Sequence, residues 1–376
     1  MQAYLCNSYL EIDSQILRKN YRSIRSVLPE HVELIPVLKG DAYGFGAVNV
    51  ARIMQEEGAE TFAVAQICEA VELLDSGING EMLVLAAFPA PQLSTAVERG
   101  IMLTVFTPDM VTLVEKEAKA QNKRAGVHIK IETGLNRIGV KPGKDLDELI
   151  KALKECSHVD VRGVYSHFID GEINNSPLAV RQFGIYKEAL KQFEAAGIDV
   201  PVKHMCNSGA SEWYNDAYLD AVRIGRRLYM DSRDYALPAG SPGTVEEAAS
   251  WRTSITALRT VEPGESVGYD EKFIAKRPTA VATICIGYGD GLIPDFADAG
   301  SPVLINGKLA KYIGVYMDQS SLDVTGIDCS VGDEVTVFGR ASDGSFLSAQ
   351  VLAKTVNHEG VFFTDRLTKR VERRWK

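Results

Sequence analysis

From residue 33 to about residue 225 the chain alternates short apolar runs with amphipathic segments, and this alternation restricts the fold more than any other feature. Such a pattern is typical of a parallel sheet whose faces are covered by helices. Eight runs predict strands, at 33–38, 61–65, 81–86, 101–105, 126–132, 161–166, 202–205 and 221–224. Helical patterns lie between them, as at 47–57, 67–76, 108–121 and 178–196. Three of these patterns are directly followed by a glycine, Gly58, Gly77 or Gly197, at the position that a helix C-cap favours. Eight strands alternating with helices predict a (β/α)8 barrel, an α/β fold of the TIM type.

The pattern changes after about residue 240, where Pro238, Gly240, Pro242 and Gly243 interrupt regular structure. β-branched runs follow, and they predict strands at 254–261, 279–286, 302–305, 321–324 and 334–337, with turn signals at Pro263-Gly264 and Asn306-Gly307. We therefore expect a barrel over residues 11–238 and a β-rich C-terminal domain over 239–376, with residues 1–10 packed against the second domain. For the basic C-terminal stretch LTKRVERRWK, charge alone leaves open whether it is a solvated tail.

Charge and composition narrow the class of partner. The chain has 376 residues and a formal net charge of −9, so it lacks the basic surface that nucleic acids and anionic membranes require. The sequence contains no apolar stretch of about 18 residues and no signal-peptide pattern, which predicts a globular protein with no membrane segment. Its six cysteines lie far apart without metal-binding spacing. They indicate a reducing, cytoplasmic compartment, with neither disulfides nor a bound metal, and small molecules are the expected partners.

The sharpest functional signal is Lys39, in the string VLKGDAYGFG at 37–46. Active sites of such barrels lie at the carboxyl ends of the strands, and Lys39 directly follows the first predicted strand. Apolar walls at that place lower the pKa of an amine by desolvation and leave it free to attack a carbonyl carbon. Most lysines at strand ends are simply solvated, so the surrounding residues have to decide between the two interpretations.

The whole string closely resembles the cofactor-lysine motif of the alanine racemase family. The family usually has Ala-Asn where this chain has Gly40-Asp41, and His where it has Phe45. Further stretches resemble the family in the same order along nearly the whole chain: IKIETGLNRIGV (129–140), VYSHF (164–168), NSGAS (207–211), VRIG (222–225), GYD (268–270), IGYGDG (286–291) and YMDQ (316–319). The resemblance implies a homodimeric racemase that uses pyridoxal 5′-phosphate, with the cofactor bound in the barrel and carried by Lys39.

The resemblance also assigns the surroundings of the cofactor. Arg223 matches the arginine that faces the ring nitrogen, and since a guanidinium stays protonated it cannot protonate the ring, which makes the cofactor a weaker electron sink. His167 matches a histidine that packs against the ring. The other cofactor-binding residues that the resemblance implies, several of them around the phosphate, are Lys39, Tyr43, Asn207, Ser208, Gly225, Arg226 and Tyr288.

Racemisation removes a proton from one face of Cα and returns one to the other, so two bases must flank the substrate. Lys39 and Tyr269 match the family's pair, with the tyrosine supplied by the partner subunit. A phenol alone is a weak base at neutral pH, and Arg223 or His167 is expected to assist it. The substrate-binding residues implied are Arg137, which pairs with the carboxylate; Lys130, which is carbamylated in many members and orients that arginine; Met317; and Asp318.

The chain departs from the family near its C-terminus, and this leaves the substrate open. Alanine racemases commonly carry a tyrosine before RVPR, whereas this chain reads LTKRVERR, with Lys369 or Arg366 at the tyrosine position depending on the alignment. Arg226 and Arg227 also stand where small or apolar residues are usual. We expect alanine or serine as the substrate, and a larger or acidic amino acid is the alternative.

Two other functions stay open at this point. A decarboxylase of the same barrel class is expected to place a carboxylate at the ring nitrogen, where this chain has Arg223. A non-catalytic pyridoxal-phosphate carrier shares the barrel and the lysine, but it has no second domain and therefore no counterpart of Tyr269. The sequence also leaves open whether the chain is the excised part of a membrane-anchored racemase.

Overall fold

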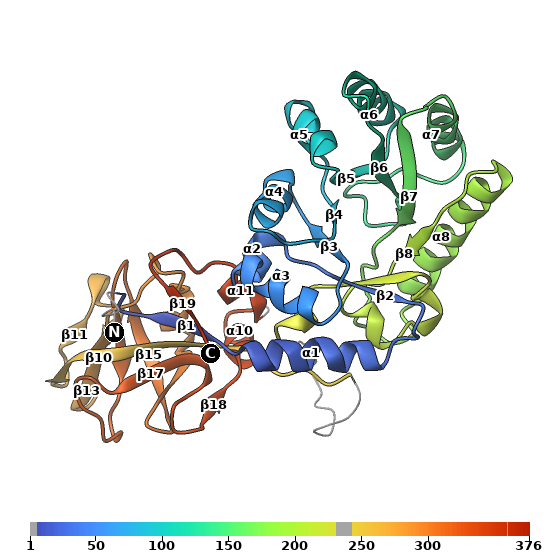
Figure 1. Cartoon of the computed structure of the whole chain (residues 1–376). Coiled ribbons are helices and arrows are strands. Elements are labelled where there is room, and N and C mark those ends of the chain that lie inside the picture. The colour runs from blue at the N-terminus through green and yellow to red at the C-terminus, as the bar shows by residue number, and fades with distance from the viewer. Residues whose placement is uncertain (1–5, 231–242, 359) are drawn as a thin grey trace.

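The computed structural model describes residues 6–230, 243–358 and 360–376 (Figure 1). Its first part is a parallel eight-stranded sheet in the order β2-β9-β8-β7-β6-β5-β4-β3. A further parallel bridge, between Val37 after β2 and Ala63 in β3, closes the sheet into a barrel. The predicted (β/α)8 barrel is confirmed, and each predicted run overlaps one strand: β2 Glu33–Pro36, β3 Thr61–Val64, β4 Glu81–Val84, β5 Met102–Val105, β6 Ala125–Lys130, β7 Val159–Tyr165, β8 Val202–His204 and β9 Ala221–Ile224.

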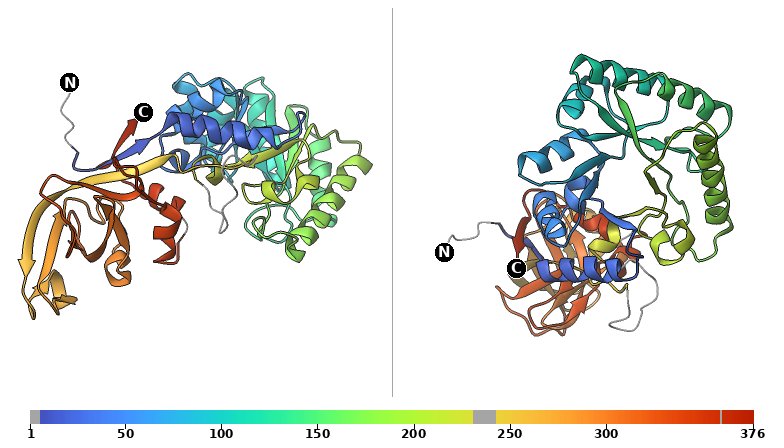
Figure 2. Two further views of the ribbon diagram at one scale, coloured as in Figure 1. Left: turned by 90° about the horizontal axis from the view of Figure 1, so that it is seen from below. Right: turned by 45° about the vertical axis from the view of Figure 1, so that its right-hand side comes forward.

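Helices follow the strands and surround the barrel (Figures 1 and 2). The four helices predicted from periodicity are α3, α4, α6 and α8, and α3, α4 and α8 are each followed by a glycine with positive φ, as the predicted helix ends require. The helices of this part are α1 Ser14–Ser26, α3 Ala47–Glu56, α4 Ile67–Asp75, α5 Leu93–Glu98, α6 Pro108–Ala120, α7 Lys144–Lys154 and α8 Pro177–Ala195, with 3-10 turns η1 Ala90–Gln92, η2 Ala210–Glu212, η3 Asn215–Ala217 and η4 Arg226–Leu228.

The barrel interior changes from apolar to polar along its axis. A compact apolar cluster is formed by Ile35, Val37, Ala63, Leu83, Met102 and Ala221. The buried polar side chains lie at or near the carboxyl ends of the strands: Thr104, His128, Lys130, Tyr165, His204 and Arg223. Since parallel strands all end at the same mouth of a barrel, these side chains gather where barrel enzymes place their active sites.

The segment that carries Lys39, α2 Lys39–Tyr43, is a left-handed turn, with φ of +62°, +54° and +53° at Gly40, Asp41 and Ala42. This backbone conformation costs roughly 1–2 kcal/mol for each residue with a Cβ, so other contacts must hold it. Glu69 accepts a hydrogen bond from the N–H of Gly40 at 2.7 Å, and Arg373 donates to the carbonyl of Gly44 at 2.9 Å. The loop behind Lys39 is therefore fixed at both ends by ionic side chains from distant parts of the chain.

The second part is β-rich, as predicted, and forms a nine-stranded sheet in the order β18-β17-β14-β15-β16-β13-β10-β1-β19, with a separate β11-β12 pair. Its elements are β10 Ala249–Val261, β11 Ser266–Val267, η5 Tyr269–Glu271, β12 Phe273–Ile274, β13 Thr279–Ile284, α9 Asp295–Ala299, β14 Pro302–Ile305, β15 Lys308–Val315, β16 Ser320–Asp323, β17 Glu334–Arg340, β18 Phe346–Leu347, α10 Ala349–Lys354 and α11 Val361–Thr364. The predicted turn at Asn306-Gly307 joins β14 to β15, and both residues have positive φ. Of the breaker residues, Pro238, Gly240 and Pro242 lie outside the described residues.

The two ends of the chain meet in this second sheet. β1 Tyr9–Ile12 pairs with β10 in antiparallel and with β19 Glu372–Trp375 in parallel orientation. The basic C-terminal stretch is therefore part of the fold and not a solvated tail. A side chain on Gly44 would collide with the carbonyl of Thr364, so the C-terminal segment packs directly on the loop behind Lys39.

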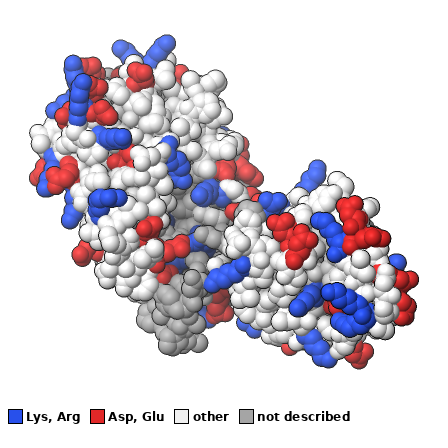
Figure 3. All heavy atoms as spheres, turned by 180° about the vertical axis from the view of Figure 1, so that it is seen from behind, with Lys and Arg blue, Asp and Glu red and all other residues white. Residues whose placement is uncertain are grey.

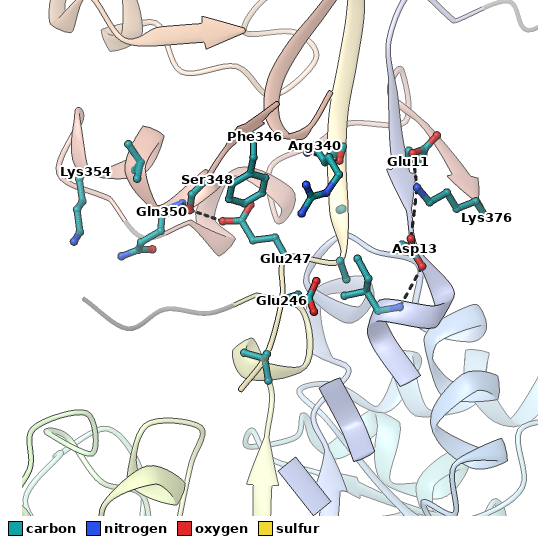
Figure 4. Close-up of a pocket in the computed structure, with 16 residues that line it drawn as sticks. Glu11, Asp13, Glu246, Glu247, Arg340, Phe346, Ser348, Gln350, Lys354 and Lys376 are labelled. Carbon is teal, nitrogen blue, oxygen red and sulfur yellow. Dashed lines mark hydrogen bonds and ion pairs between the residues drawn. The ribbon is translucent and has the colours of Figure 1, made fainter. Parts of the chain in front are cut away.

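Polar contacts hold the two parts together. Asn20 of α1 is buried, and its amide donates to the carbonyls of Leu228 and Glu246 at 2.9 and 2.8 Å. A cavity of about 460 Å³ lies at this junction, where Lys376 pairs with Glu11 at 3.3 Å (Figure 4). Seen from behind, the surface is hollowed between the two lobes, with Lys and Arg side chains around the hollow (Figure 3).

Candidate active site

A pocket of about 370 Å³ opens at the carboxyl ends of the barrel strands. It brings together predicted residues from five separate segments of the chain: Lys39, Tyr43, Lys130, Arg137, His167, Asn207, Ser208, Arg223 and Gly225. The remaining wall is largely apolar and includes Val37, Ala65, Leu85 and Ile138. An enclosed apolar pocket with a few convergent polar groups has the composition of a small-molecule site.

Lys39 lies in this pocket with its amine 5.7 Å from the centre of the Tyr43 ring. Burial lowers the pKa of Lys39, and the nearby charge of Arg137 lowers it further, while Asp365 and Glu69 act in the opposite direction. A lowered pKa increases the fraction of free amine at neutral pH, and the free amine is the nucleophilic and basic form.

Two hydroxyl groups and a backbone amide meet at the start of η4. Ser208 Oγ accepts the N–H of Gly225 at 3.0 Å, and a side chain on Gly225 would collide with the hydroxyl of Tyr43. Only glycine allows the Tyr43 hydroxyl to lie this close to the backbone. The two hydroxyl groups can donate hydrogen bonds to an anion, and no Asp or Glu is among the residues that line the pocket. Both features suit a phosphate group.

Arg223 is fully buried, and its charge is solvated by neutral groups. It donates to the carbonyls of Ser166 at 2.7 Å and Met205 at 3.3 Å, and its Nη1 lies 2.7 Å from Nδ1 of His204. Over the described residues, no carboxylate forms an ion pair with it. Burial lowers the pKa of Arg223, but a guanidinium still keeps its proton at ordinary pH, so Arg223 presents a donor and a charge but no transferable proton.

His167 lies beside Arg223, with its Nδ1 3.5 Å from Nη2 of the arginine. The amide of Asn207 approaches Nε2 of His167 at 3.3 Å and donates to the carbonyl of Phe168 at 3.1 Å. Burial and the charge of Arg223 lower the pKa of His167 well below its usual value. The ring is therefore neutral and held in place on one side of the pocket.

Arg137 stands on a loop that folds back on the end of β6. Val140 donates to the carbonyl of Lys130 at 2.9 Å, and Glu132 donates to the carbonyl of Val140 at 2.9 Å. Gly139 is required there, because a Cβ would lie 2.7 Å from the nitrogen of Glu132 at a φ of +136°. This closed loop carries the exposed Arg137 to the rim of the pocket, where it can meet an anion.

Lys130 is buried below that loop, with its amine 4.6 Å from the centre of the Tyr165 ring. Burial, and then the charges of Arg223 and Arg137, lower the pKa of Lys130 well below its usual value. No ion pair to this amine is found among the described residues. Glu132 acts in the opposite direction, but the lowered pKa leaves Lys130 as a neutral, nucleophilic amine next to two arginines.

Five predicted residues do not line this pocket of the same chain. Tyr269, Met317 and Tyr288 belong to the second part, with side chains 78%, 60% and 49% exposed, and Asp318 is exposed beside them. β11, which directly precedes Tyr269, lies in the outer part of the second lobe, far from α2 and Lys39 (Figure 1). Arg226 follows Gly225, but its guanidinium pairs with Glu172 outside the pocket lining.

Sequence reasoning missed three neighbours of the predicted residues. His204 and Tyr165 are the last residues of β8 and β7, a position at which a polar residue signals a barrel site. Asp365 gave no such signal, because it follows a short helix in an irregular segment. Its charge acts on Lys39, and desolvation raises the pKa of Asp365 to about 6. The C-terminal residue whose charge acts on Lys39 in the described part of the chain is thus an acid, whereas the alignments suggested the cations Arg366 and Lys369.

Comparison with known proteins agrees with this geometry. The sequence model of the alanine racemase N-terminal domain matches residues 12–233, and that of the alanine racemase C-terminal domain matches residues 248–375. The chain belongs to the alanine racemase family. Both parts of the chain match the family, so the similarity is not limited to the barrel.

Relatives cover nearly the whole chain. Alanine racemase 2 of Caldanaerobacter subterraneus is 34% identical over 93% of this chain and 90% of its own length. The structure of alanine racemase from Bacillus anthracis with bound L-Ala-P has a TM-score of 0.91 at 29% identity, covering 98% of this chain and 95% of that one. Alanine racemase from Bartonella henselae with covalently bound pyridoxal phosphate has a TM-score of 0.87 at 26% identity, covering 98% and 99%. Among the described residues, no helix is long and apolar enough to cross a membrane.

Proposed function

We propose that this chain interconverts L- and D-alanine with pyridoxal 5′-phosphate as its cofactor. The observation that carries the proposal is the pocket in which Lys39 shares apolar walls with the buried cation Arg223, in a chain whose two parts both match the alanine racemase family. A decarboxylase is less well supported, because no carboxylate stands beside Arg223 among the described residues. A carrier without a second domain is less well supported by the match over residues 248–375.

The residues of the pocket fit the cofactor in size and chemistry. Lys39 would hold it covalently, Tyr43, Ser208 and the backbone at Gly225 would bind its phosphate, and Arg223 would face its ring nitrogen. When bound, pyridoxal phosphate supplies an electron-withdrawing ring that makes the Cα hydrogen of an attached amino acid acidic. His167, held by Asn207, would keep that ring flat against the pocket wall.

Proton transfer is assigned to two side chains on opposite faces of the substrate. The Lys39 amine, with its lowered pKa, takes up or releases a proton on one face. The Tyr269 hydroxyl does the same on the other face, and the charge of Arg223 assists it. Because Arg223 has no proton to give to the ring, the proton that leaves Cα is held by one of these two groups until it is replaced.

The substrate carboxylate is assigned to Arg137 at the rim of the pocket, supported by the backbone of Met317 with Asp318 behind it. We propose that carbon dioxide reacts with the neutral amine of Lys130, forming an N–C bond and releasing one proton. The resulting carbamate carries a negative charge, which would pair with Arg137 and orient it. It would also add a negative charge next to the two arginines.

The site is proposed to be completed by a second copy of this chain. Tyr269 is 78% exposed and lies outside the pocket of its own chain, and the centre of its ring is 5.7 Å from that of the Tyr316 ring. Met317, which follows Tyr316 in the chain, and Tyr288, whose N–H donates to the carbonyl of Tyr316, are exposed as well. An isologous dimer would insert Tyr269 of each chain into the other's pocket and cover these side chains.

Serine is the second candidate substrate, because the family's tyrosine near the C-terminus is absent and the carboxyl group of Asp365 acts on Lys39. A carboxylate can accept a hydrogen bond from a serine hydroxyl, whereas the methyl group of alanine makes none.

We further propose the domain division given above, with a barrel over 11–238, a second domain over 239–376 and the N-terminal segment packed against the second domain. We also propose a cytoplasmic location, in line with six free cysteines.

A chiral assay over the L-amino acids tests the proposed reaction. We expect inversion of alanine at the highest kcat/KM, followed by serine, and a loss of about a thousand-fold or more in Lys39→Ala. Lys187→Ala, on the exposed side of α8, is the control and should keep full activity. A wild-type enzyme that inverts neither alanine nor any other small neutral amino acid would refute the proposal.

Mixing two inactive variants tests the shared site. Lys39→Ala and Tyr269→Phe should each be nearly inactive alone, whereas a mixed dimer contains one site with both native groups. Random reassortment of equal amounts should restore about a quarter of wild-type activity, because about half of the dimers are mixed and each has one of two sites intact. If Tyr269 served its own chain, the mixture would be no more active than its components.

Mass spectrometry tests the carbamate on Lys130. At neutral pH under native conditions the protein should carry the added mass of one carbon dioxide, and acidification should remove it, since a protonated carbamate decomposes. The variant Lys130→Arg should lack the increment at every pH. An unmodified wild-type chain at neutral pH in bicarbonate buffer would rule the modification out.

A further inference from the structure

A line of buried groups continues from Arg223 away from the pocket. Nη1 of Arg223 lies 2.7 Å from Nδ1 of His204, and Nε2 of His204 lies 2.9 Å from Nδ1 of His128. His128, His204 and Arg223 are all buried from solvent. Their hydrogen bonds must therefore be made among themselves and to the surrounding protein.

The donors and acceptors along this line can be arranged in only one way. A guanidinium has N–H donors and no acceptor, so Nδ1 of His204 must present a lone pair to Arg223. The proton of a neutral His204 is then on Nε2, where it is donated to Nδ1 of His128. A doubly protonated His204 would point an N–H at a guanidinium N–H, and two donors repel.

The surrounding residues keep both rings in this orientation. His128 fits only because residue 163 is glycine, since a Cβ there would lie 2.5 Å from Nδ1 and 2.6 Å from Cε1 of the ring. His204 is stacked on the ring of Tyr165, with centroids 5.0 Å apart and an angle of 13° between the planes. The Tyr165 hydroxyl bonds in turn to Thr104 at 2.8 Å. Neither imidazole has space to turn over.

Electrostatics agree with two neutral rings. Burial, and then the charge of Arg223, lower the pKa of His128 to about 3. The same causes lower the pKa of His204 well below its usual value. Both imidazoles therefore stay uncharged at neutral pH and act through their tautomer.

We propose that His128 is a positioning residue for this enzyme: by accepting the Nε2 proton of His204, it stabilises the tautomer and ring orientation in which His204 turns a lone pair toward Arg223. Arg223 is thereby held with its remaining edge toward the pocket, although His128 itself does not line that pocket. This inference rests on the proposed function, because it assumes that the orientation of Arg223 matters to racemisation.

The test compares two variants of nearly equal shape, His128→Asn and His128→Leu. Asparagine places an acceptor oxygen near the position of Nδ1, and leucine does not. In the full-length protein with ¹⁵N-labelled histidine, NMR should report a neutral His204 protonated on Nε2 in the wild type and in the Asn variant. The Leu variant should lose this signature, because a buried N–H without an acceptor is costly.

Kinetics provide the second measurement. The Leu variant should lose about ten-fold or more in kcat with little change in KM, as is typical when an outer partner of an active-site group is removed, and the Asn variant should recover most of the loss. Tyr218→Phe is the matched control, since it removes another buried hydrogen bond, from the hydroxyl to the carbonyl of Ser211, and Tyr218 is not among the groups whose charge acts on Arg223. It should lower stability and leave kcat and the His204 signals unchanged.

Three results would overturn the proposal. One is a wild-type His204 that is charged or protonated on Nδ1, which needs no variant to observe and does not depend on activity. The second is a Leu variant that keeps the His204 signature and the wild-type kcat and loses only stability, which would make His128 a packing residue. The third is an Asn variant as impaired as the Leu variant. Failure of the wild type to racemise alanine would instead refute the proposed function and leave the NMR result standing.

Discussion

The buried guanidinium of Arg223 organises the polar part of the barrel, at the carboxyl ends of its strands. Taking a cation out of water costs about several kcal/mol even after the protein relaxes, so neighbouring groups must replace the water. Around Arg223 these groups are two backbone carbonyls and the lone pair of His204, all of them neutral. The charge is thus stabilised without being cancelled. Burial, and then this charge, lower the pKa values of Lys130, His167 and His204, so these three nitrogen bases stay unprotonated around one pocket.

Much of this could be predicted from the sequence, for physical reasons that differ between elements. Each barrel strand is a local apolar run, and the turn at Asn306-Gly307 depends on the positive φ of two neighbouring residues, so both were predicted correctly. β15 was missed, because its run KLAKYIGV mixes exposed lysines with small residues and has no clear apolar pattern. The pairing of β1 with β19 was missed for another reason: it joins the two ends of the chain, and no local signal marks it.

The candidate site likewise contains residues that local motifs predicted and residues that they did not. Lys39, Arg137 and Arg223 lie in motifs whose residues are close in sequence, and all three reach the pocket. His204 and Asp365 reach the site through tertiary contacts that no local motif marks. His204 contacts Arg223, and Asp365 is brought in by the packing of residue 364 on Gly44. In this irregular C-terminal segment, alignment with the family motif pointed only to Arg366 and Lys369, at the position of the family's tyrosine. Tyr269, the proposed second base, stands at the surface of the other lobe and outside the pocket of its own chain, and this gives the proposed dimer a chemical role.

The central claim is that Lys39 and Tyr269 serve opposite faces of the substrate, and exchange of the Cα hydrogen in D₂O tests it most directly. The measurement uses the Tyr269→Phe enzyme and follows deuterium incorporation into L-alanine and D-alanine separately. If Lys39 still serves its own face, the variant will exchange the hydrogen of one enantiomer and return that enantiomer without inversion. Exchange of both enantiomers at equal rates, or inversion at the wild-type rate, would contradict the two-base account.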